Sequence, residues 1–251
     1  MLTKSKIAQI KSLSDKKARA ESGLFVAEGP KLVGELLQSA LTVRGVYGLE
    51  ETLAGLPALA DVTAVSAKEM DRISHLKTPS KVLALVEIPR YDFDPHALTQ
   101  NLTLALDDVQ DPGNVGTIIR LADWFGITNI YCSPTTADAF NPKVVQATMG
   151  AISRVRLHYT ELPHVLEEAR RQGIPVYGTF LDGERLYSAR ISTVGVIVMG
   201  NEGKGISPPV TRHITRKIFI PPYPEGIPTS ESLNVAIATA VVCAEFRRPQ
   251  K

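Results

Sequence analysis

The sequence is poor in the features that mark several classes of protein. It has two cysteines and one tryptophan in 251 residues, and 28 Lys and Arg stand against 26 Asp and Glu. No apolar run approaches the roughly 20 residues that cross a bilayer. Residues 1–19 are polar and basic, without the apolar stretch of a secretory signal peptide. We therefore expect neither a membrane-spanning nor a secreted protein, and the net charge of +2 does not by itself identify a nucleic-acid partner.

Metal ligands and familiar nucleotide motifs are also missing. Cys132 and Cys243 lie far apart within apolar segments and are predicted to be reduced packing residues of a cytosolic protein. The five histidines show no metal-ligand spacing with them, so we expect no metal site. The sequence has no P-loop, no early G-x-G-x-x-G motif and no G-x-S-x-G elbow.

Hydrophobic patterning divides the chain into two α/β domains, residues 1–92 and 99–251, joined by a linker at 88–99 that carries two prolines. The first domain is predicted to contain strands at 24–27, 43–49, 62–65 and 82–88, with helices within 23–39 and near 52–59 and 67–74. The second is predicted to contain strands at 102–106, 129–132, 154–158, 176–180, 194–199 and 217–220, and helices at 115–125, 142–149, 162–172 and 232–247.

Regular alternation of strands and helices in the second domain predicts a mostly parallel sheet covered on both faces. Its last helix is apolar around much of its circumference and must be buried, with a second subunit as one candidate cover. The first twenty residues carry six cations against Asp15: Lys4, Lys6, Lys11, Lys16, Lys17 and Arg19. This basic segment is predicted either to contact RNA phosphates or to form a solvated helix that docks through Ile7, Ile10 and Leu13, and the two alternatives are compatible.

Three stretches of the second domain are candidates for chemistry. Residues 104–126, LALDDVQDPGNVGTIIRLADWFG, indicate a strand, a polar turn and a helix, an arrangement that places an anion site at the carboxyl end of a strand, with Arg120 as a phosphate ligand. The alternative is that Asn114 only caps the helix and Arg120 is solvated. Asp107 and Asp108 are equally consistent with turn and capping roles.

The second stretch, VIVMGNEGKGIS at 196–207, runs from a buried strand into a turn whose glycines allow close backbone approach or positive φ, with Glu202 in the bend. The third, IFIPPYPEGIPTSESLNVA at 218–236, is a strand, a proline-rich loop and a helix opened by Ser and Asn.

In order and spacing, the three stretches resemble the three motifs of the SpoU (TrmH-like) RNA 2'-O-ribose methyltransferases of the SPOUT class. NVGTIIRLADWFG resembles motif one, VIVMGNEGKGIS motif two, and Ile220-Pro221 with SESLNVAIATA motif three. VVQATMGAISRV at 144–155 is similar to the family's linking helix, and GLFVAEGPKLVGELL resembles the start of its L30e-like substrate-binding domain. The loop PPYPEGIPTSES is several residues longer than is usual in the family.

The resemblance implies a carboxyl-terminal trefoil knot that binds S-adenosylmethionine, and a homodimer in which each site borrows residues from the partner. It assigns cofactor binding to Gly200, Ile220 and Leu233, with Met199, Asn201 and Thr179 as neighbours. It assigns the reactive side of the site to Asn114, Arg120, Glu202, Ser232 and Asn234.

The implied reaction is methyl transfer to a ribose 2'-hydroxyl, which fixes the partner as RNA. The family assigns the base to the arginine that matches Arg120, but a guanidinium stays protonated, and a phosphate clamp explains the same requirement. Within the family, a first domain of this type with a basic amino terminus is more common among the ribosomal RNA enzymes, so the resemblance favours 23S-type ribosomal RNA over transfer RNA. The competing predictions are a non-catalytic RNA-binding or ribosome-assembly protein on the same scaffold, and a SPOUT enzyme that methylates a base nitrogen.

Overall fold

The computed structural model describes residues 1–57, 61–224, 226–227 and 230–248. The chain forms two compact units: Met1–Arg90 with Asp138–Arg154, and Tyr91–Ala137 with Val155–Lys251. Residues 138–154 pack with the first unit, although in sequence they fall within the range predicted for the second domain. The domain ranges 1–92 and 99–251 therefore stay a prediction, and each compact unit is described by itself.

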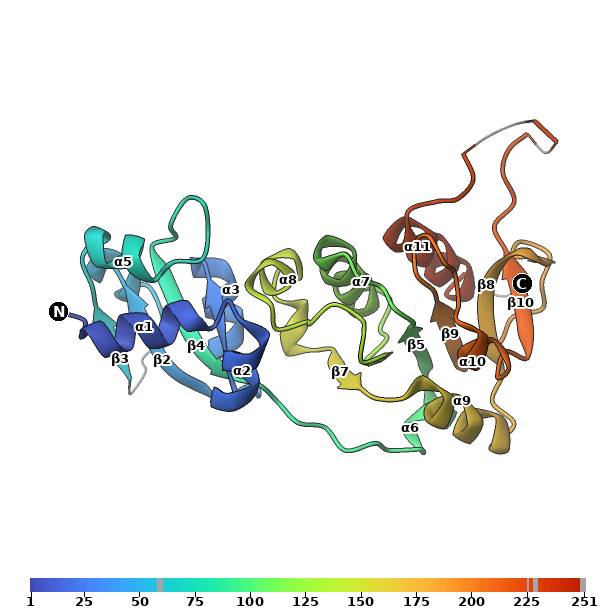
Figure 1. Ribbon diagram of the computed structural model, residues 1–251, viewed down its shortest axis with the longest axis horizontal. Helices are drawn as coiled ribbons and strands as arrows, with labels where there is room; N and C mark the ends of the chain where they lie inside the picture. Colours follow the sequence, from blue (N-terminus) through green and yellow to red (C-terminus); the bar gives the residue numbers. More distant parts are fainter. Residues whose placement is uncertain (58–60, 225, 228–229, 249–251) are drawn as a thin grey trace. The chain divides into compact units, whose positions relative to one another are not determined.

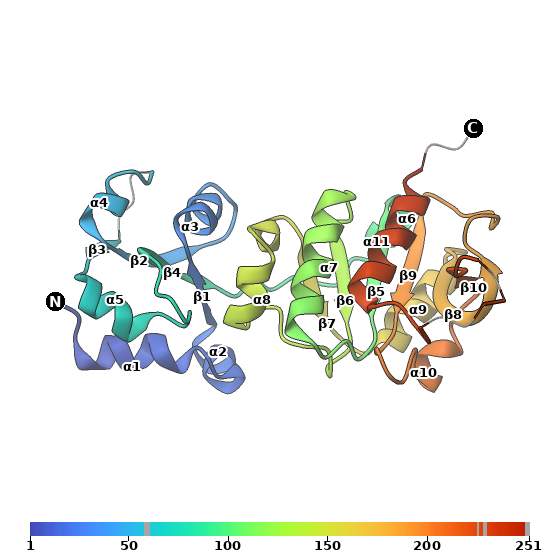
Figure 2. The same ribbon diagram turned by 90° about the horizontal axis from the view of Figure 1, so that it is seen from above.

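The first unit is built on a four-stranded mixed sheet of order β1-β4-β2-β3. β4 pairs antiparallel with β1 and β2, and β3 pairs parallel with β2. Figure 2 shows α1 and α5 on one side of this sheet and α3 on the other. The elements are α1 (Lys4–Ser12), α2 (Lys16–Ser22), β1 (Leu24–Glu28), α3 (Pro30–Leu37), β2 (Val43–Gly48), α4 (Glu50–Leu53), β3 (Val62–Ala64), α5 (Ala67–Ile73), β4 (Val82–Glu87), α8 (Pro142–Ala147) and the 3₁₀ turn η1 (Ala151–Ser153).

The basic amino-terminal segment is helical and docks on the sheet of this unit. Ile10 and Leu13 are fully buried in one cluster with Met70 and Leu85, and Ile7 packs against it, so the docking alternative is confirmed. The cations of the segment differ in exposure: Lys4, Lys11, Lys16 and Lys17 are exposed and Lys6 is partly so, whereas Arg19 is 2% exposed.

The second unit is built on a six-stranded sheet of order β10-β8-β9-β5-β6-β7, in which every strand pair is parallel. Figures 1 and 2 show α7 and α11 on one face of this sheet and α6, α9 and α10 on the other, which confirms the predicted parallel sheet. The elements are α6 (Ala97–Gln100), β5 (Leu102–Leu106), α7 (Pro112–Trp124), β6 (Asn129–Cys132), β7 (Arg156–Tyr159), α9 (Leu162–Arg171), β8 (Val176–Arg185), β9 (Gly195–Met199), α10 (Pro208–Thr211), β10 (Arg216–Phe219) and α11 (Val235–Phe246).

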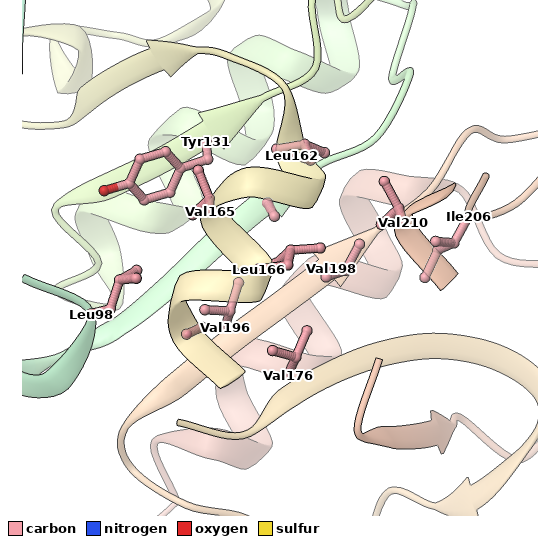
Figure 3. Packing of buried hydrophobic residues seen from close by; sticks show 12 residues of the cluster. Leu98, Tyr131, Leu162, Val165, Leu166, Val176, Val196, Val198, Ile206 and Val210 are labelled. Carbon is pink, nitrogen blue, oxygen red and sulfur yellow. The ribbon is translucent and has the colours of Figure 1, made fainter. Parts of the chain in front are cut away.

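One face of the parallel sheet is packed by α9. Leu162, Val165 and Leu166 of this helix lie against Val176 and the two buried valines of β9, as Figure 3 shows. Burial of this kind stabilises by about 25 cal/mol per Å² of apolar surface. The central strands are therefore fixed rigidly, and their carboxyl ends form a firm base for the loops that follow.

Both cysteines are free and buried, as predicted. Burial raises the pKa of the Cys132 thiol and raises that of Cys243 to about 12, so both side chains are unreactive packing groups. Within the described part of the chain, no helix is both long and apolar enough to span a membrane.

Several element boundaries differ from the predicted ones for local reasons. α7 begins at Pro112 because Asp111 caps it and proline suits the first helical position. α11 begins three residues later than predicted, since Asn234 is its N-cap. β8 continues to Arg185, five residues past its predicted end, and α4 ends at Leu53. The end of the helix predicted near 52–59 lies outside the described residues.

Candidate active site

The three candidate stretches follow the strands β5, β9 and β10 of the second unit. β5 and β9 are parallel neighbours, and the Asp107 amide continues their pairing by donating to the Met199 carbonyl at 2.9 Å. Because parallel strands end on the same edge of a sheet, the loops after β5 and β9 lie side by side, where ligands of open α/β sheets bind.

The loop after β5 is braced by its three aspartates. The buried Asp107 carboxylate accepts from the Ser207 amide at 2.7 Å. Asp108, at φ 59°, accepts from the Asn201 side chain through its main-chain oxygen at 2.8 Å. Asp111 accepts from the Asn114 amide at 2.8 Å. Sequence reasoning left Asp107 and Asp108 open between roles, and their place immediately after a buried strand was the signal for this bracing function.

The glycine-rich turn after β9 closes tightly on itself. Asn201 and Gly205 exchange both main-chain hydrogen bonds, at 3.0 and 2.9 Å. A side chain at Gly200 would place its Cβ 2.4 Å from the Gly205 carbonyl carbon, and Gly205 itself has φ +69°. The prediction of close approach and positive φ is thereby confirmed at these two positions.

A chain of side-chain hydrogen bonds connects the three stretches. Asn234 donates its Nδ2 to Asn114 Oδ1 at 2.9 Å, and Asn114 donates its Nδ2 to Glu202 Oε1 at 2.7 Å. Asn234 Oδ1 in turn accepts from the amides of Ala236 and Ile237, at 3.0 and 3.2 Å, at the start of α11. We call these three residues, Asn114, Glu202 and Asn234, the polar relay. The alternative that Asn114 caps the helix is wrong, because Asp111 is the N-cap of α7 and the Asn114 side chain bonds to the other two stretches instead.

The other predicted site residues stand apart from the polar relay. Arg120 and Ser232 are exposed, and neither side chain has a hydrogen bond or ion pair with the described residues. Met199 is buried at the end of β9, Thr179 donates to the Val198 carbonyl at 3.4 Å, and Ile220 directly follows β10. Leu233 is 51% exposed beside the relay's Asn234.

Arg19, predicted to contact RNA, does not belong to an exposed basic surface. Its guanidinium donates to the Leu13 carbonyl at 2.7 Å and to Asp138 Oδ2 at 2.5 and 3.1 Å. A buried guanidinium that is held by Asp138 and by main-chain carbonyls is unavailable to a phosphate, so this assignment is corrected. Among the described residues, no group of three or more His, Cys, Asp or Glu side chains could hold a metal ion.

Solved structures with this fold include RNA methyltransferases. A solved structure of an AdoMet-bound rRNA methyltransferase from Sinorhizobium meliloti matches at TM-score 0.85 and 30% identity, covering 99% of this chain and 96% of that one. A TrmH-family protein of Porphyromonas gingivalis matches at TM-score 0.90 and 44% identity, covering 99% of both chains.

Residues 101–244 match the model of the SpoU rRNA Methylase family, and residues 4–84 match the MRM3-like substrate binding domain. The chain belongs to the SpoU rRNA methylase family. It is 30% identical over 245 residues, 96% of each chain, to the 23S rRNA (guanosine(2553)-2'-O)-methyltransferase RlmP of Bacillus subtilis.

Proposed function

We propose that this protein transfers a methyl group from S-adenosylmethionine to a ribose 2'-hydroxyl of 23S-type ribosomal RNA, in the cytoplasm. The polar relay carries the proposal, because it joins three motifs distant in sequence at the sheet edge where the fold binds ligands. The relative from Bacillus subtilis, which aligns with nearly the whole chain, is a 23S rRNA 2'-O-methyltransferase.

The turn after β9 fits S-adenosylmethionine. Gly200 and Gly205 bring main chain together without side chains, so no side chain at these two positions blocks a ligand from approaching the turn. The exposed Glu202 carboxylate supplies a negative charge that suits a sulfonium. Gly200, Ile220 and Leu233 would hold the cofactor, with Met199, Asn201 and Thr179 beside them. When bound, the cofactor supplies an electrophilic methyl group.

Arg120 would act as a phosphate clamp. Its guanidinium is exposed and has no partner among the described residues, so its five donors are available for a ligand. A bidentate contact to the phosphate next to the target ribose would place the 2'-hydroxyl in line with the methyl group, and such positioning supplies several kcal/mol. Ser232 would lie near the same ribose.

The first unit would bind the RNA outside the target nucleotide. Lys4, Lys6, Lys11, Lys16 and Lys17 supply cations on its two amino-terminal helices, and five phosphate contacts would make binding strongly salt-dependent. The match of residues 4–84 to a substrate-binding domain supports this assignment.

The protein would work as a homodimer with a carboxyl-terminal trefoil knot. Trp124 at the end of α7 is 83% exposed and Ile237 on the neighbouring α11 is 54% exposed. Large apolar side chains in such positions favour a protein partner, and a second copy of the chain would cover them.

The experiment uses isotopically labelled S-adenosylmethionine with ribosomal and transfer RNA from cells lacking this protein, and R120A as the control. We expect label in the ribosomal pool, recovered as a 2'-O-methyl nucleoside and absent with R120A. Label only in transfer RNA would show that the substrate is transfer RNA and not ribosomal RNA. Label on a base would show that the enzyme methylates a base nitrogen and not the ribose. Failure to bind the cofactor would favour a non-catalytic RNA-binding protein.

A further inference from the structure

Methyl transfer to a hydroxyl leaves a proton that some group must accept. We propose that the carboxylate of Glu202 is this acceptor, and that Asn114 and Asn234 are positioning residues that hold it in place. The inference rests on the proposed function and adds a chemical role for one residue of the site.

The direction of the polar relay is fixed from its far end. Asn234 Oδ1 accepts from two main-chain amides at the start of α11, which can only donate. Its Nδ2 must therefore donate, and Asn114 must receive that bond on Oδ1. Asn114 is left with only its Nδ2 group for Glu202, so Glu202 Oε1 is an obligate acceptor. The relay thus holds Glu202 through Oε1 and leaves Oε2 without a partner among the described residues.

The aspartates nearby are engaged otherwise. Asp107 is buried and accepts from Ser207, and Asp111 caps α7. Asp108 accepts from Gln110 on Oδ1 at 2.9 Å and from Asn201 on Oδ2 at 3.3 Å. Glu202 is exposed, and its one hydrogen bond among the described residues is to Asn114. It therefore combines access to a ligand with an oxygen that no described residue uses.

Arg120 does not suit the same task. A guanidinium has five donors and no acceptor, and it stays protonated in proteins. Assigning the phosphate contact to Arg120 and the proton to Glu202 gives each group a role that matches its chemistry. The carboxylate must come within hydrogen-bond reach of the 2'-hydroxyl in the complex.

The step is balanced with these groups. A bond forms between the ribose 2'-oxygen and the methyl carbon, and the bond from this carbon to sulfur breaks, leaving its electron pair on sulfur. The hydroxyl proton moves to Glu202. The sulfonium and the carboxylate are consumed together, so the site has the same net charge before and after the transfer.

The test is E202Q in the full-length protein, in single-turnover transfer to the RNA pool that the wild type methylates. Glutamine has nearly the same shape as glutamate and keeps an oxygen that accepts from Asn114. If Glu202 had only a structural role, E202Q would therefore transfer the methyl group at the wild-type rate. We expect the rate to fall by about 100-fold or more, in the range of general-base effects. Binding of S-adenosylmethionine and of RNA should change by less than about threefold. E231Q is the matched control, since Glu231 is exposed and has no bond to a described residue.

A double variant tests the positioning role. If Asn114 acts only through Glu202, N114A slows the wild type but adds nothing to the loss in E202Q. Transfer by E202Q within threefold of the wild type overturns the inference, as does a loss that lies wholly in cofactor affinity. Additive losses in the double variant overturn the role of Asn114. A wild type that transfers no methyl group overturns the proposed function and, with it, the role of Glu202. An active wild type with an equally active E202Q overturns only the role of Glu202.

Discussion

The two units contain hydrogen-bonded polar networks of opposite character. In the first unit, the Glu28 carboxylate, 3% exposed, accepts from the Ser74 hydroxyl at 2.5 Å and the His75 amide at 2.7 Å. Arg19 is equally buried there. In the second unit, the polar relay is formed by Asn114, which is half-buried, and by Glu202 and Asn234, which are exposed.

The difference in burial distinguishes polar side chains that stabilise the fold from polar side chains that serve the site. A buried charge that loses its partner costs several kcal/mol, so the hydrogen bonds of Arg19 stabilise the first unit. An exposed side chain can find water instead, and an exposed surface pair contributes about 0–1 kcal/mol. The hydrogen bonds between the side chains of the polar relay therefore contribute little to the free energy of unfolding. We infer that their role is to hold the Glu202 carboxylate in a defined position. The predictions below change the buried network, Arg120 and the polar relay one at a time.

The largest effect is expected for R19M in the buried network. The variant leaves the Asp138 carboxylate and the carbonyl oxygens of Leu13 and Ser14 without their donor. We expect the free energy of unfolding to fall by about 3–5 kcal/mol, as for other broken buried pairs. Urea unfolding of the full-length protein, followed by circular dichroism, measures it.

K17M is the control on the same helix, α2. The Lys17 side chain is 84% exposed and pairs with Glu21 at 3.9 Å, so its loss should cost less than about 1 kcal/mol. Equal destabilisation by the two variants would contradict the structural role of Arg19.

The next effect is on activity, for R120K. Lysine keeps the charge of Arg120 but loses the planar fork, and misplacement of a substrate by about 1 Å costs on the order of 100-fold in rate. We expect that loss in the transfer rate with unchanged unfolding, since the exposed side chain has no hydrogen bond or ion pair with a described residue. Near-normal turnover would exclude the clamp.

A smaller effect on stability distinguishes the two roles of Asn234, as the N-cap of α11 and as the donor to Asn114. N234A removes the cap of α11 and should lower the free energy of unfolding by about 1 kcal/mol. N234D keeps an oxygen for the helix amides, so it should unfold like the wild type, but it has no donor for Asn114. We expect both variants to slow methyl transfer. Full activity in N234D would show that methyl transfer requires Asn234 only as the N-cap of α11 and not as a donor to Asn114.

The strands and most helices were predictable because each signal is local. A buried parallel strand is apolar over its whole length, as β5 and β9 are, and a helix that covers a sheet has one apolar face, as α9 has. The glycine turn was predictable for the same reason, since Gly200 and Gly205 meet needs that only glycine satisfies.

What the sequence could not show are pairings between distant residues. Arg19 stands among five lysines in an apparently uniform basic segment, and its partner Asp138 lies 119 residues away. Composition cannot tell the one buried cation from its neighbours. The polar relay likewise spans 88 and 120 residues, so the resemblance could assign Asn114, Glu202 and Asn234 to one site without showing which atom bonds to which.

The smallest expected effect returns to the buried network and depends on pH. His75 Nε2 lies 2.9 Å from the Ile10 carbonyl, and burial lowers the pKa of this imidazole below its ordinary 6.5, against the opposing pull of Glu28 and with Lys11 and Arg19 nearby. Because the unfolded chain takes up the proton first as pH falls, the free energy of unfolding should decline below about pH 6.5 and be constant above it with respect to this group. The measurement is urea unfolding at pH 7.5 and pH 5.5 for the wild type and H75Q. The wild type should lose more stability on acidification than H75Q, and an equal loss in both would show that His75 is protonated as easily in the folded unit as in the unfolded chain.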